Sequence, residues 1–137
     1  MPALIDTDVA IELMRRNPYT LECVANFPEA ISVSSITASE LYFGAYNSAH
    51  PEENALKVQR FLDNFPLFTI TDETARIFGR TKANLRRQSV QVAPFDLMIA
   101  AIAIENSCII ATGNVRHFRP IGDLHIVDWI RGDGLEH

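Results

Sequence analysis

The chain contains few of the residues that build metal clusters or disulfide frameworks. Cysteine occurs only twice in 137 residues, as Cys23 and Cys108. A structural zinc cluster needs more ligands, at closer spacing, than these two thiols offer. Cys108 lies in an apolar run and is expected to be a small, buried hydrophobic side chain. A disulfide with Cys23 is not expected in a reducing cytosol.

Long apolar runs and leader sequences are also missing. No run approaches the ~20 apolar residues that cross a bilayer, and the N-terminus lacks the basic-then-apolar layout of a signal peptide. We therefore expect a cytoplasmic protein that spans no membrane. Hydrophobic residues make up 47% and charged residues 21% of the chain, which is typical of a globular rather than a disordered protein.

No internal repeat, low-complexity segment or interdomain linker interrupts the chain. Its length is that of one domain, long enough to bury about two-thirds of its unfolded surface. We predict a single domain over residues 1–131 and a tail at 132–137. Residues 135–137, Leu-Glu-His, resemble the start of a vector-derived histidine tag.

The chain also lacks an excess of positive charge. It has 17 acidic and 12 basic residues, which gives a formal net charge of −5. The whole molecule therefore has no general attraction to nucleic acid. More than half of the bases nevertheless lie within residues 76–119. A local basic face can bind phosphates on an acidic protein, although a solvated helix surface would explain the same residues. Arg86 and Arg87 are our candidates for substrate binding within this segment.

What the sequence does contain is an alternation of short apolar runs and helical patterns. Strands are expected at residues 3–6, 31–33, 65–71, 108–111 and 124–127. Helices are expected at residues 8–16, 19–26, 37–47, 51–64, 72–87 and 95–106, and Asp72 is the expected cap of the fifth. Strands separated by helices pair in parallel, so we predict a three-layer α/β/α sandwich with a central parallel sheet.

Three carboxylates lie where an apolar run or a loop gives way to a helical pattern: Asp6, Glu40 and Asp96. In an open α/β sheet, functional groups gather beyond the carboxyl ends of the strands. Three acids brought together there would provide oxygen ligands for a hard divalent cation. The arrangement predicts metal-dependent chemistry on a phosphate-bearing substrate.

Each acid also has a local explanation. Asp6 and Asp8 could cap the helix that follows them. Glu40 fits a capping box with Thr37, in which the glutamate bonds back to the backbone at the helix start. Asp96 fits an acidic first turn that complements the helix dipole. These explanations treat the acids one at a time, and the equivalent positions of all three favour a shared metal site.

Asn114 follows the strand expected at 108–111 and marks a fourth position of the same kind. It either caps the next turn, supplies a neutral oxygen to the site or orients a water. The hydroxyls of Thr7 and Thr112 are expected to position the carboxylates, and both residues are candidates for substrate contact. His117 is interpreted as a surface or packing histidine rather than a general base.

Four segments carry these polar residues in a fixed order: 6–8, 34–44, 95–101 and 111–118. In this order and at this spacing they resemble the four blocks of the PIN-domain nucleases, most closely the VapC-type toxins of type II toxin–antitoxin modules. The ending at 121–129 is similar to the last strand of that family. The resemblance therefore covers nearly the whole chain.

The resemblance implies a parallel sheet flanked by helices, an Mg²⁺- or Mn²⁺-dependent endoribonuclease activity, a small antitoxin partner and a homodimer. By motif position, Asp6, Glu40 and Asp96 would form the acidic metal site, while Asp8 stands at a variable position. Asn114 would replace a residue that is often a fourth aspartate. Without that carboxylate, a second tightly held metal is not expected before RNA phosphate binds. The expected reaction is hydrolysis of an RNA phosphodiester bond.

Two other functions remain open at this point. Asp6-Thr7-Asp8 after an apolar strand also resembles the nucleophile motif of haloacid-dehalogenase-type phosphatases, with Asp6 as nucleophile. That family needs a late acidic pair, whose nearest candidate lies at 132–134, and it leaves Glu40 and Asp96 unexplained. The second alternative is a non-catalytic, PIN-like binding module, which the loss of one acid would favour. None of the three acids is lost here.

The segment 37–65 has more aromatic and large apolar residues than one helix face needs. We expect some of them to remain outside the core and to form a groove for an antitoxin helix. The residues concerned are Leu41, Tyr42, Phe43, Tyr46, Leu56, Phe61 and Phe65.

Overall fold

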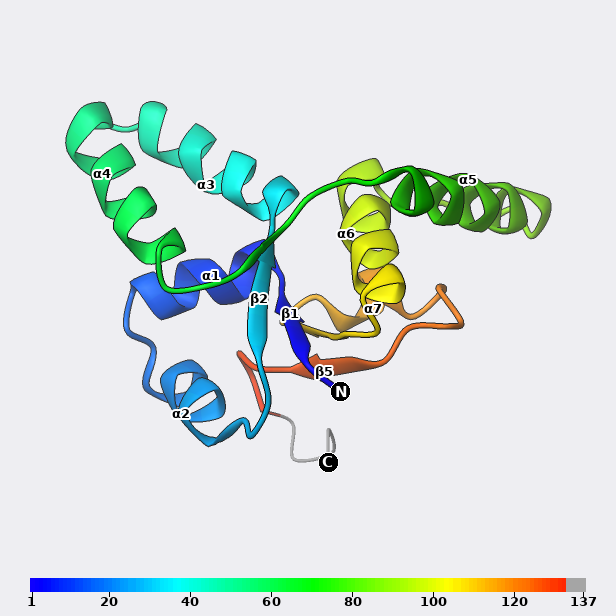
Figure 1. Ribbon diagram of the computed structural model, residues 1–137, viewed down its shortest axis with the longest axis horizontal. Helices are drawn as coiled ribbons and strands as arrows, with labels where there is room; N and C mark the ends of the chain where they lie inside the picture. The colour runs from blue at the N-terminus through cyan, green and yellow to red at the C-terminus, as the bar shows by residue number, and fades with distance from the viewer. Residues whose placement is uncertain (133–137) are drawn as a thin grey trace.

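A single parallel sheet forms the centre of the molecule (Figure 1). The computed structural model describes residues 1–132, and within them the sheet has five strands in the order β3-β2-β1-β4-β5. The strands are β1 (Ala3–Ile5), β2 (Ile31–Ser34), β3 (Leu67–Phe68), β4 (Ile109–Thr112) and β5 (Ile126–Asp128). The predicted parallel sheet is confirmed. Apart from Gly132, the expected tail and tag lie outside the described residues.

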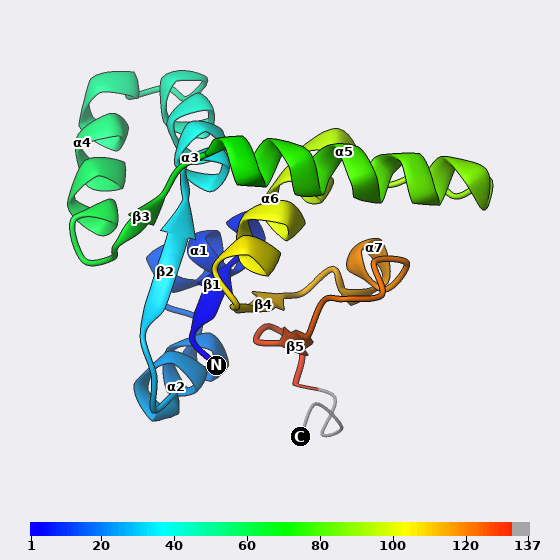
Figure 2. The ribbon, with the colours of Figure 1, turned by 45° about the vertical axis from the view of Figure 1, so that its right-hand side comes forward.

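Seven helices cover the two faces of the sheet within the described residues (Figures 1 and 2). They are α1 (Thr7–Met14), α2 (Pro18–Asn26), α3 (Ser35–Tyr46), α4 (Pro51–Leu62), α5 (Asp72–Arg87), α6 (Pro94–Glu105) and α7 (Val115–Phe118). The first four contribute to one hydrophobic core and the last three to another. The predicted three-layer sandwich is therefore confirmed. No helix in residues 1–132 is both long and apolar enough to cross a membrane.

The central strand β1 supplies both cores. Successive side chains of a strand point to opposite faces, and Leu4 accordingly packs with the α5–α7 core while Ala3 and Ile5 pack with the α1–α4 core. All three side chains are 0% exposed. Burying a large aliphatic side chain contributes roughly 2 kcal/mol, so this strand holds a fixed register. Cys108 is buried in the second core, as predicted.

The register of β1 decides where the acidic residues lie. Its last residue, Ile5, pairs with Val33 of β2 on one side and with Ala111 of β4 on the other. Residues that follow these strands therefore meet at one edge of the sheet. Asp6 leaves the middle strand at this edge, and Thr112 ends the neighbouring β4 beside it.

Two sequence expectations about local structure are wrong. The strand expected at 65–71 is only Leu67–Phe68, because this edge strand pairs with β2 alone and is largely exposed. The cap of α5 is Thr71 rather than Asp72. The Thr71 hydroxyl accepts the Thr74 N–H at 3.1 Å, and the Thr74 hydroxyl receives the Thr71 N–H at 3.0 Å. A capping box of two threonines thus moves the helix start by one residue.

Candidate active site

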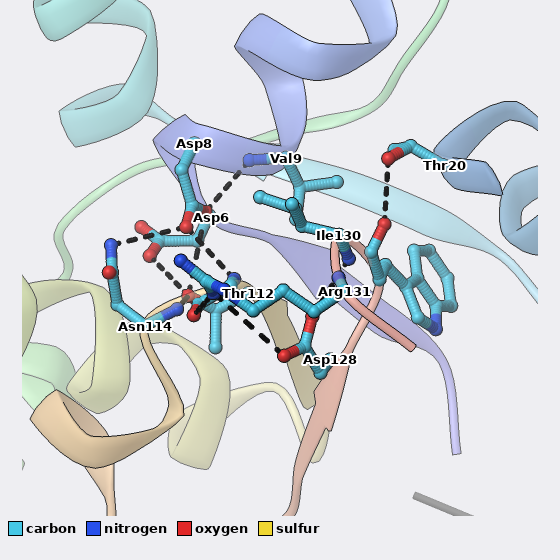
Figure 3. A network of polar contacts seen from close by, with 11 residues as sticks. Asp6, Asp8, Val9, Thr20, Thr112, Asn114, Asp128, Ile130 and Arg131 are labelled. Carbon is cyan, nitrogen blue, oxygen red and sulfur yellow. Dashed lines mark hydrogen bonds and ion pairs between the residues drawn. The ribbon is translucent and has the colours of Figure 1, made fainter. Parts of the chain in front are cut away.

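Asp6 lies at the carboxyl end of the central strand and begins α1 (Figure 3). Its carboxylate is shielded from water, with the residue only 5% exposed. One carboxylate oxygen accepts the Thr7 backbone N–H at 2.8 Å, and the other accepts the Thr112 hydroxyl at 2.8 Å. Both partners are neutral, so these bonds orient the carboxylate without balancing its charge.

Asp8 joins the first turn of α1 to the loop after β4. Its Oδ2 accepts the Gly113 N–H at 2.9 Å and the Asn114 side-chain amide at 3.1 Å. Its Oδ1 accepts the Val9 N–H at 2.8 Å. Asn114 stands at the start of α7 but makes no side-chain capping bond, so of the three alternatives for this residue the capping role is not realised. Its amide instead donates to a carboxylate.

The electrostatics of this pair favour the binding of a cation. Burial, the largest cause, and the nearby carboxylates of Asp8 and Asp96 together raise the pKa of Asp6 from 3.8 to about 7, against the lowering effect of its hydrogen bonds. Burial also raises the pKa of Asp8, with a contribution from Asp128. Negative charge therefore accumulates at the edge of the sheet, where a divalent cation would stabilise the ionised carboxylates.

Glu40 approaches the first turn of α1 from α3. The Thr7 hydroxyl donates to Glu40 Oε1 at 2.5 Å and lies 3.0 Å from the Thr37 hydroxyl. Since the one hydroxyl hydrogen of Thr7 is used for Glu40, Thr37 is the donor to Thr7. The proposed capping box of Thr37 and Glu40 does not form, because α3 begins earlier and is capped by the Ser34 hydroxyl, which accepts the Thr37 N–H at 3.1 Å. Glu40 therefore sits in the second turn.

Asp96 lies in the first turn of α6, where its carboxylate meets α7. His117 Nδ1 lies 3.3 Å from Asp96 Oδ2. The Asp96 side chain is 23% exposed and that of His117 is 57% exposed, so this pair sits at the rim of the site. Sequence reasoning had set His117 aside as a surface or packing residue. The structure places it in contact with one of the three predicted acids.

The donor set fits a hard divalent cation in its chemistry. Asp6, Glu40 and Asp96 offer carboxylate oxygens, which Mg²⁺ and related cations prefer. The burial of Asp6 beside neutral hydrogen-bond partners leaves a charge that such an ion would balance. Within residues 1–132, however, no three side chains of His, Cys, Asp or Glu lie close enough together to hold a metal ion as they stand.

The two arginines predicted to bind substrate lie elsewhere. Arg86 and Arg87 are exposed in the last turn of α5, and Arg87 Nη1 donates to Asn84 Oδ1 on the same helix at 2.6 Å. The fold thus gathers Asp6, Glu40 and Asp96 with Thr7, Thr112 and Asn114 at the sheet edge. It places the basic residues on a separate helix.

Sequence reasoning gave no role to Asp128 and Arg131. Asp128 ends β5, is 7% exposed and accepts the backbone N–H groups of Ile130 and Arg131, each at 2.8 Å. Arg131 Nη1 donates to the Gly113 carbonyl, on the loop that holds Asp8 (Figure 3). A signal for Asp128 was present, since it follows a short apolar strand just as Asp6 does. The position of Arg131 had no comparable signal.

Comparison with known proteins gives a consistent result. A family model for the PIN domain matches residues 3–123. Ribonuclease VapC2 of Haemophilus influenzae is 32% identical over 130 residues, which cover 93% of this chain and 97% of that protein. The tRNA(fMet)-specific endonuclease VapC of Shigella flexneri is 32% identical over 127 residues, covering 92% and 96%. In the solved structure of DNA-bound VapBC from Salmonella typhimurium, one chain matches with a TM-score of 0.86 and 30% identity, covering 94% of this chain and 98% of that one.

Proposed function

Since this chain belongs to the PIN-domain family, we propose that it is an endoribonuclease and the toxin of a toxin–antitoxin pair. It hydrolyses phosphodiester bonds of RNA at the carboxyl edge of its sheet. The observation that carries this function is the buried carboxylate of Asp6, whose pKa is raised to about 7 by burial and by the neighbouring acids. The similarity to proteins described as ribonucleases supports RNA as the substrate.

The cofactor in this proposal is Mg²⁺ or Mn²⁺. Asp6, Glu40 and Asp96 would hold it, because they present the charged oxygens that such ions bind. When bound, the ion would supply positive charge to the phosphoryl oxygens and lower the pKa of the attacking water. The phosphatase alternative has no comparable support, because the chain matches the PIN family.

The protein's own contribution is to hold these acids in place before substrate arrives. Thr112 orients Asp6, and Thr7 orients Glu40. His117 orients Asp96. Partners of this kind reduce the reorganisation required in the reaction and are often nearly as important as the ligands themselves.

Asp8 and Asn114 serve the site indirectly in this proposal. Both oxygens of Asp8 accept N–H groups, from Val9 on one side and from Gly113 and Asn114 on the other. Asp8 therefore holds the first turn of α1 to the loop after β4 and leaves the metal to the other three acids. Asn114 acts as a hydrogen-bond donor to Asp8 in this arrangement, a role that was not among the three alternatives weighed from the sequence.

The C-terminal half of α5 is the proposed RNA-binding surface. Arg76 and Arg80 pair with Asp72 at 2.8 Å and with Glu73 at 3.6 Å, respectively, so these four charges largely cancel. Three further basic residues follow: Lys82, Arg86 and Arg87. The helix extends beyond the rest of the molecule in both views (Figures 1 and 2), which makes these cations accessible to a phosphate backbone.

The proposed antitoxin site is a hollow between α1, α3 and α4. Its lining is mainly apolar, with Ile11, Met14, Leu41, Ala45 and Val58 among its residues. Glu40 also lines it, so an amphipathic helix seated there would end beside the acidic site. This is the helix-in-groove mode of recognition. The similarity to a VapBC complex supports the choice of partner.

A cleavage assay with defined RNA tests the activity. We expect RNA to be cut when Mg²⁺ or Mn²⁺ is added, and chelation by EDTA to stop the reaction. Asp6→Asn and Asp96→Asn should each abolish cleavage, because a charged oxygen is lost while helix capping is preserved. The control is Asp63→Asn, an exposed acid at the end of α4, which should cut at the wild-type rate. Undiminished cleavage by both site variants would refute the proposal.

A further inference from the structure

The loop after β4 controls the position of Asp8. Two of the hydrogen bonds to Asp8 come from this loop, through the Gly113 N–H and the Asn114 amide. The loop also carries Thr112, whose hydroxyl holds Asp6. A shift of residues 112–114 would therefore move both aspartates of β1–α1 at once. Whatever fixes this loop fixes the acidic site.

The chain segment after β5 closes directly over the loop. A Cβ atom added at Gly113 would lie 2.7 Å from Ile130 Cδ1, 3.0 Å from Asp8 Oδ2 and 3.1 Å from Arg131 Nη1. A side chain at position 113 would therefore displace the ends of these three side chains. The Trp129 N–H also donates to the Thr112 carbonyl at 3.3 Å, so the contact involves backbone as well as side chains.

The segment 128–131 is itself held firmly. The Asp128 carboxylate accepts two backbone N–H groups of the turn that follows it. The Trp129 carbonyl accepts the Thr20 hydroxyl at 2.7 Å, and the Trp129 ring is 6% exposed. Arg131 therefore emerges from a defined backbone position and reaches the loop over a short distance.

We propose that Arg131 is a positioning residue for the acidic site, acting through the Gly113 carbonyl to hold the loop that binds Asp8 (Figure 3). Its Nη1 also lies 4.0 Å from Asp128 Oδ2, so one guanidinium bridges the loop and the end of β5. The planar, multi-donor guanidinium suits such a bridge better than an ammonium group does. The side chain is 66% exposed, so it acts by a directed hydrogen bond rather than as a buried charge.

The test compares Arg131→Gln and Arg131→Lys with the wild type in the full-length protein. Only its measurements of kcat and KM rest on the proposed ribonuclease activity. We expect Arg131→Gln to lower kcat by about tenfold to a hundredfold, as losses of supporting contacts do, with KM little changed. Amide exchange at Gly113, measured by NMR in the metal-free protein, should quicken in the same variant. Arg131→Lys should restore part of the lost kcat and part of the protection of the Gly113 amide, because lysine keeps a cationic donor.

Arg60→Gln is the matched control, an exposed arginine on α4, and it should leave both measurements unchanged. Wild-type kcat and Gly113 exchange in Arg131→Gln would overturn the proposal. A raised KM with unchanged Gly113 exchange would overturn it too, because the guanidinium would then be binding RNA directly. If the wild type cuts no RNA, the proposed function fails, and the exchange measurement alone still decides whether Arg131 holds the loop.

Discussion

Asp6 combines two properties that oppose each other in the absence of a cation. Its side chain is buried, and its hydrogen-bond partners are a backbone amide and a hydroxyl. Burial favours the protonated carboxyl, whereas binding of a divalent ion requires the carboxylate. The metal-free protein should therefore be strained by its own active site at neutral pH.

The pH dependence of stability follows from this conflict. The pKa of Asp6 is about 7 in the folded protein and near its ordinary 3.8 when unfolded. Between those values the folded state keeps a proton that the unfolded chain releases, so the stability of the metal-free protein should fall as pH rises from about 4 to about 7. The Asp6→Asn variant should show a smaller fall. Above pH 7 its free energy of unfolding should exceed that of the wild type by up to about 4 kcal/mol.

Urea unfolding in EDTA across this pH range measures the effect. Asp63→Asn serves again as the control, since it removes an exposed acid of the same type. A wild-type stability that does not fall with pH, or an Asp6→Asn variant no more stable than the wild type at pH 8, would contradict the prediction.

The identity of the site residues was more predictable from sequence than their contacts. Asp6, Glu40 and Asp96 were predicted from their positions at the starts of helical patterns, which are local features. The partner of Asp8, in contrast, is Gly113, which is 105 residues away in the chain. Such a bond depends on the order and register of the strands, and no local pattern encodes it. The same reason explains why the contacts of His117 with Asp96 and of Arg131 with the Gly113 carbonyl could not be predicted.

At the scale of single elements, local signals worked best where several agreed. The long helix α5 ends at Arg87 as predicted, and β1 and β2 lie within about one residue of their expected bounds. The strand expected at 65–71 shrank to two residues because its outer edge has no neighbour to pair with. Apolar composition alone therefore overestimated the length of this strand.

The helix α5 permits a direct test of RNA binding. Arg86→Ala combined with Arg87→Ala should weaken RNA binding and flatten its salt dependence by about 1.4 in log–log slope, because each phosphate contact on single-stranded RNA contributes about 0.7. Fluorescence anisotropy with labelled RNA, at a series of salt concentrations and without cleavage-supporting metal, measures the slope.

The matched control uses the same helix and the same loss of charge. Arg76→Ala combined with Arg80→Ala removes two arginines that already pair with acids, so the slope should change much less. Equal slopes for both double variants would mean that position on α5 does not matter. If the salt-dependence slope of the Arg86→Ala, Arg87→Ala variant is unchanged, these two arginines do not bind RNA and belong to an ordinary solvated helix surface.

The whole molecule has a sheet edge that carries the acids and a helical hairpin, α3–α4, that stands beside it (Figure 2). Two hollows lie on this hairpin. One faces α1 and includes Glu40, while the other is lined by Tyr42, Tyr46 and Leu56 among others. The expected groove over 37–65 therefore corresponds to two candidate surfaces, and only the first reaches the active site.

Gly44 distinguishes these surfaces experimentally. It lines the first hollow, and a Cβ atom there would meet nothing within 4 Å. Gly44→Gln should fill the hollow without strain and weaken binding of the cognate antitoxin by on the order of tenfold. Gly79→Gln on α5 is the control, because a Cβ at that helical glycine is equally free of contacts. Calorimetry with the antitoxin measures both, and equal affinities for the two variants would place the antitoxin elsewhere.

The homodimer that the family resemblance implies stays a prediction. Phe43, Tyr46 and Leu56 are 69%, 56% and 45% exposed on the α3–α4 hairpin, which is a large apolar surface for a monomer to leave in water. Light scattering on the purified chain, with and without antitoxin, measures the oligomeric state directly.

The hydrogen bond between Asn114 and Asp8 also bears on how such a site can evolve. Codons for asparagine and aspartate differ by a single base, so a fourth carboxylate is one mutation away. That mutation would replace the donor 3.1 Å from Asp8 Oδ2 with a second acid, and the two would repel each other until a cation arrived. A lineage in which Asp8 is first replaced by a neutral residue avoids this repulsion between two carboxylates. Positions 8 and 114 should therefore change together among relatives, and the order of the two changes should matter.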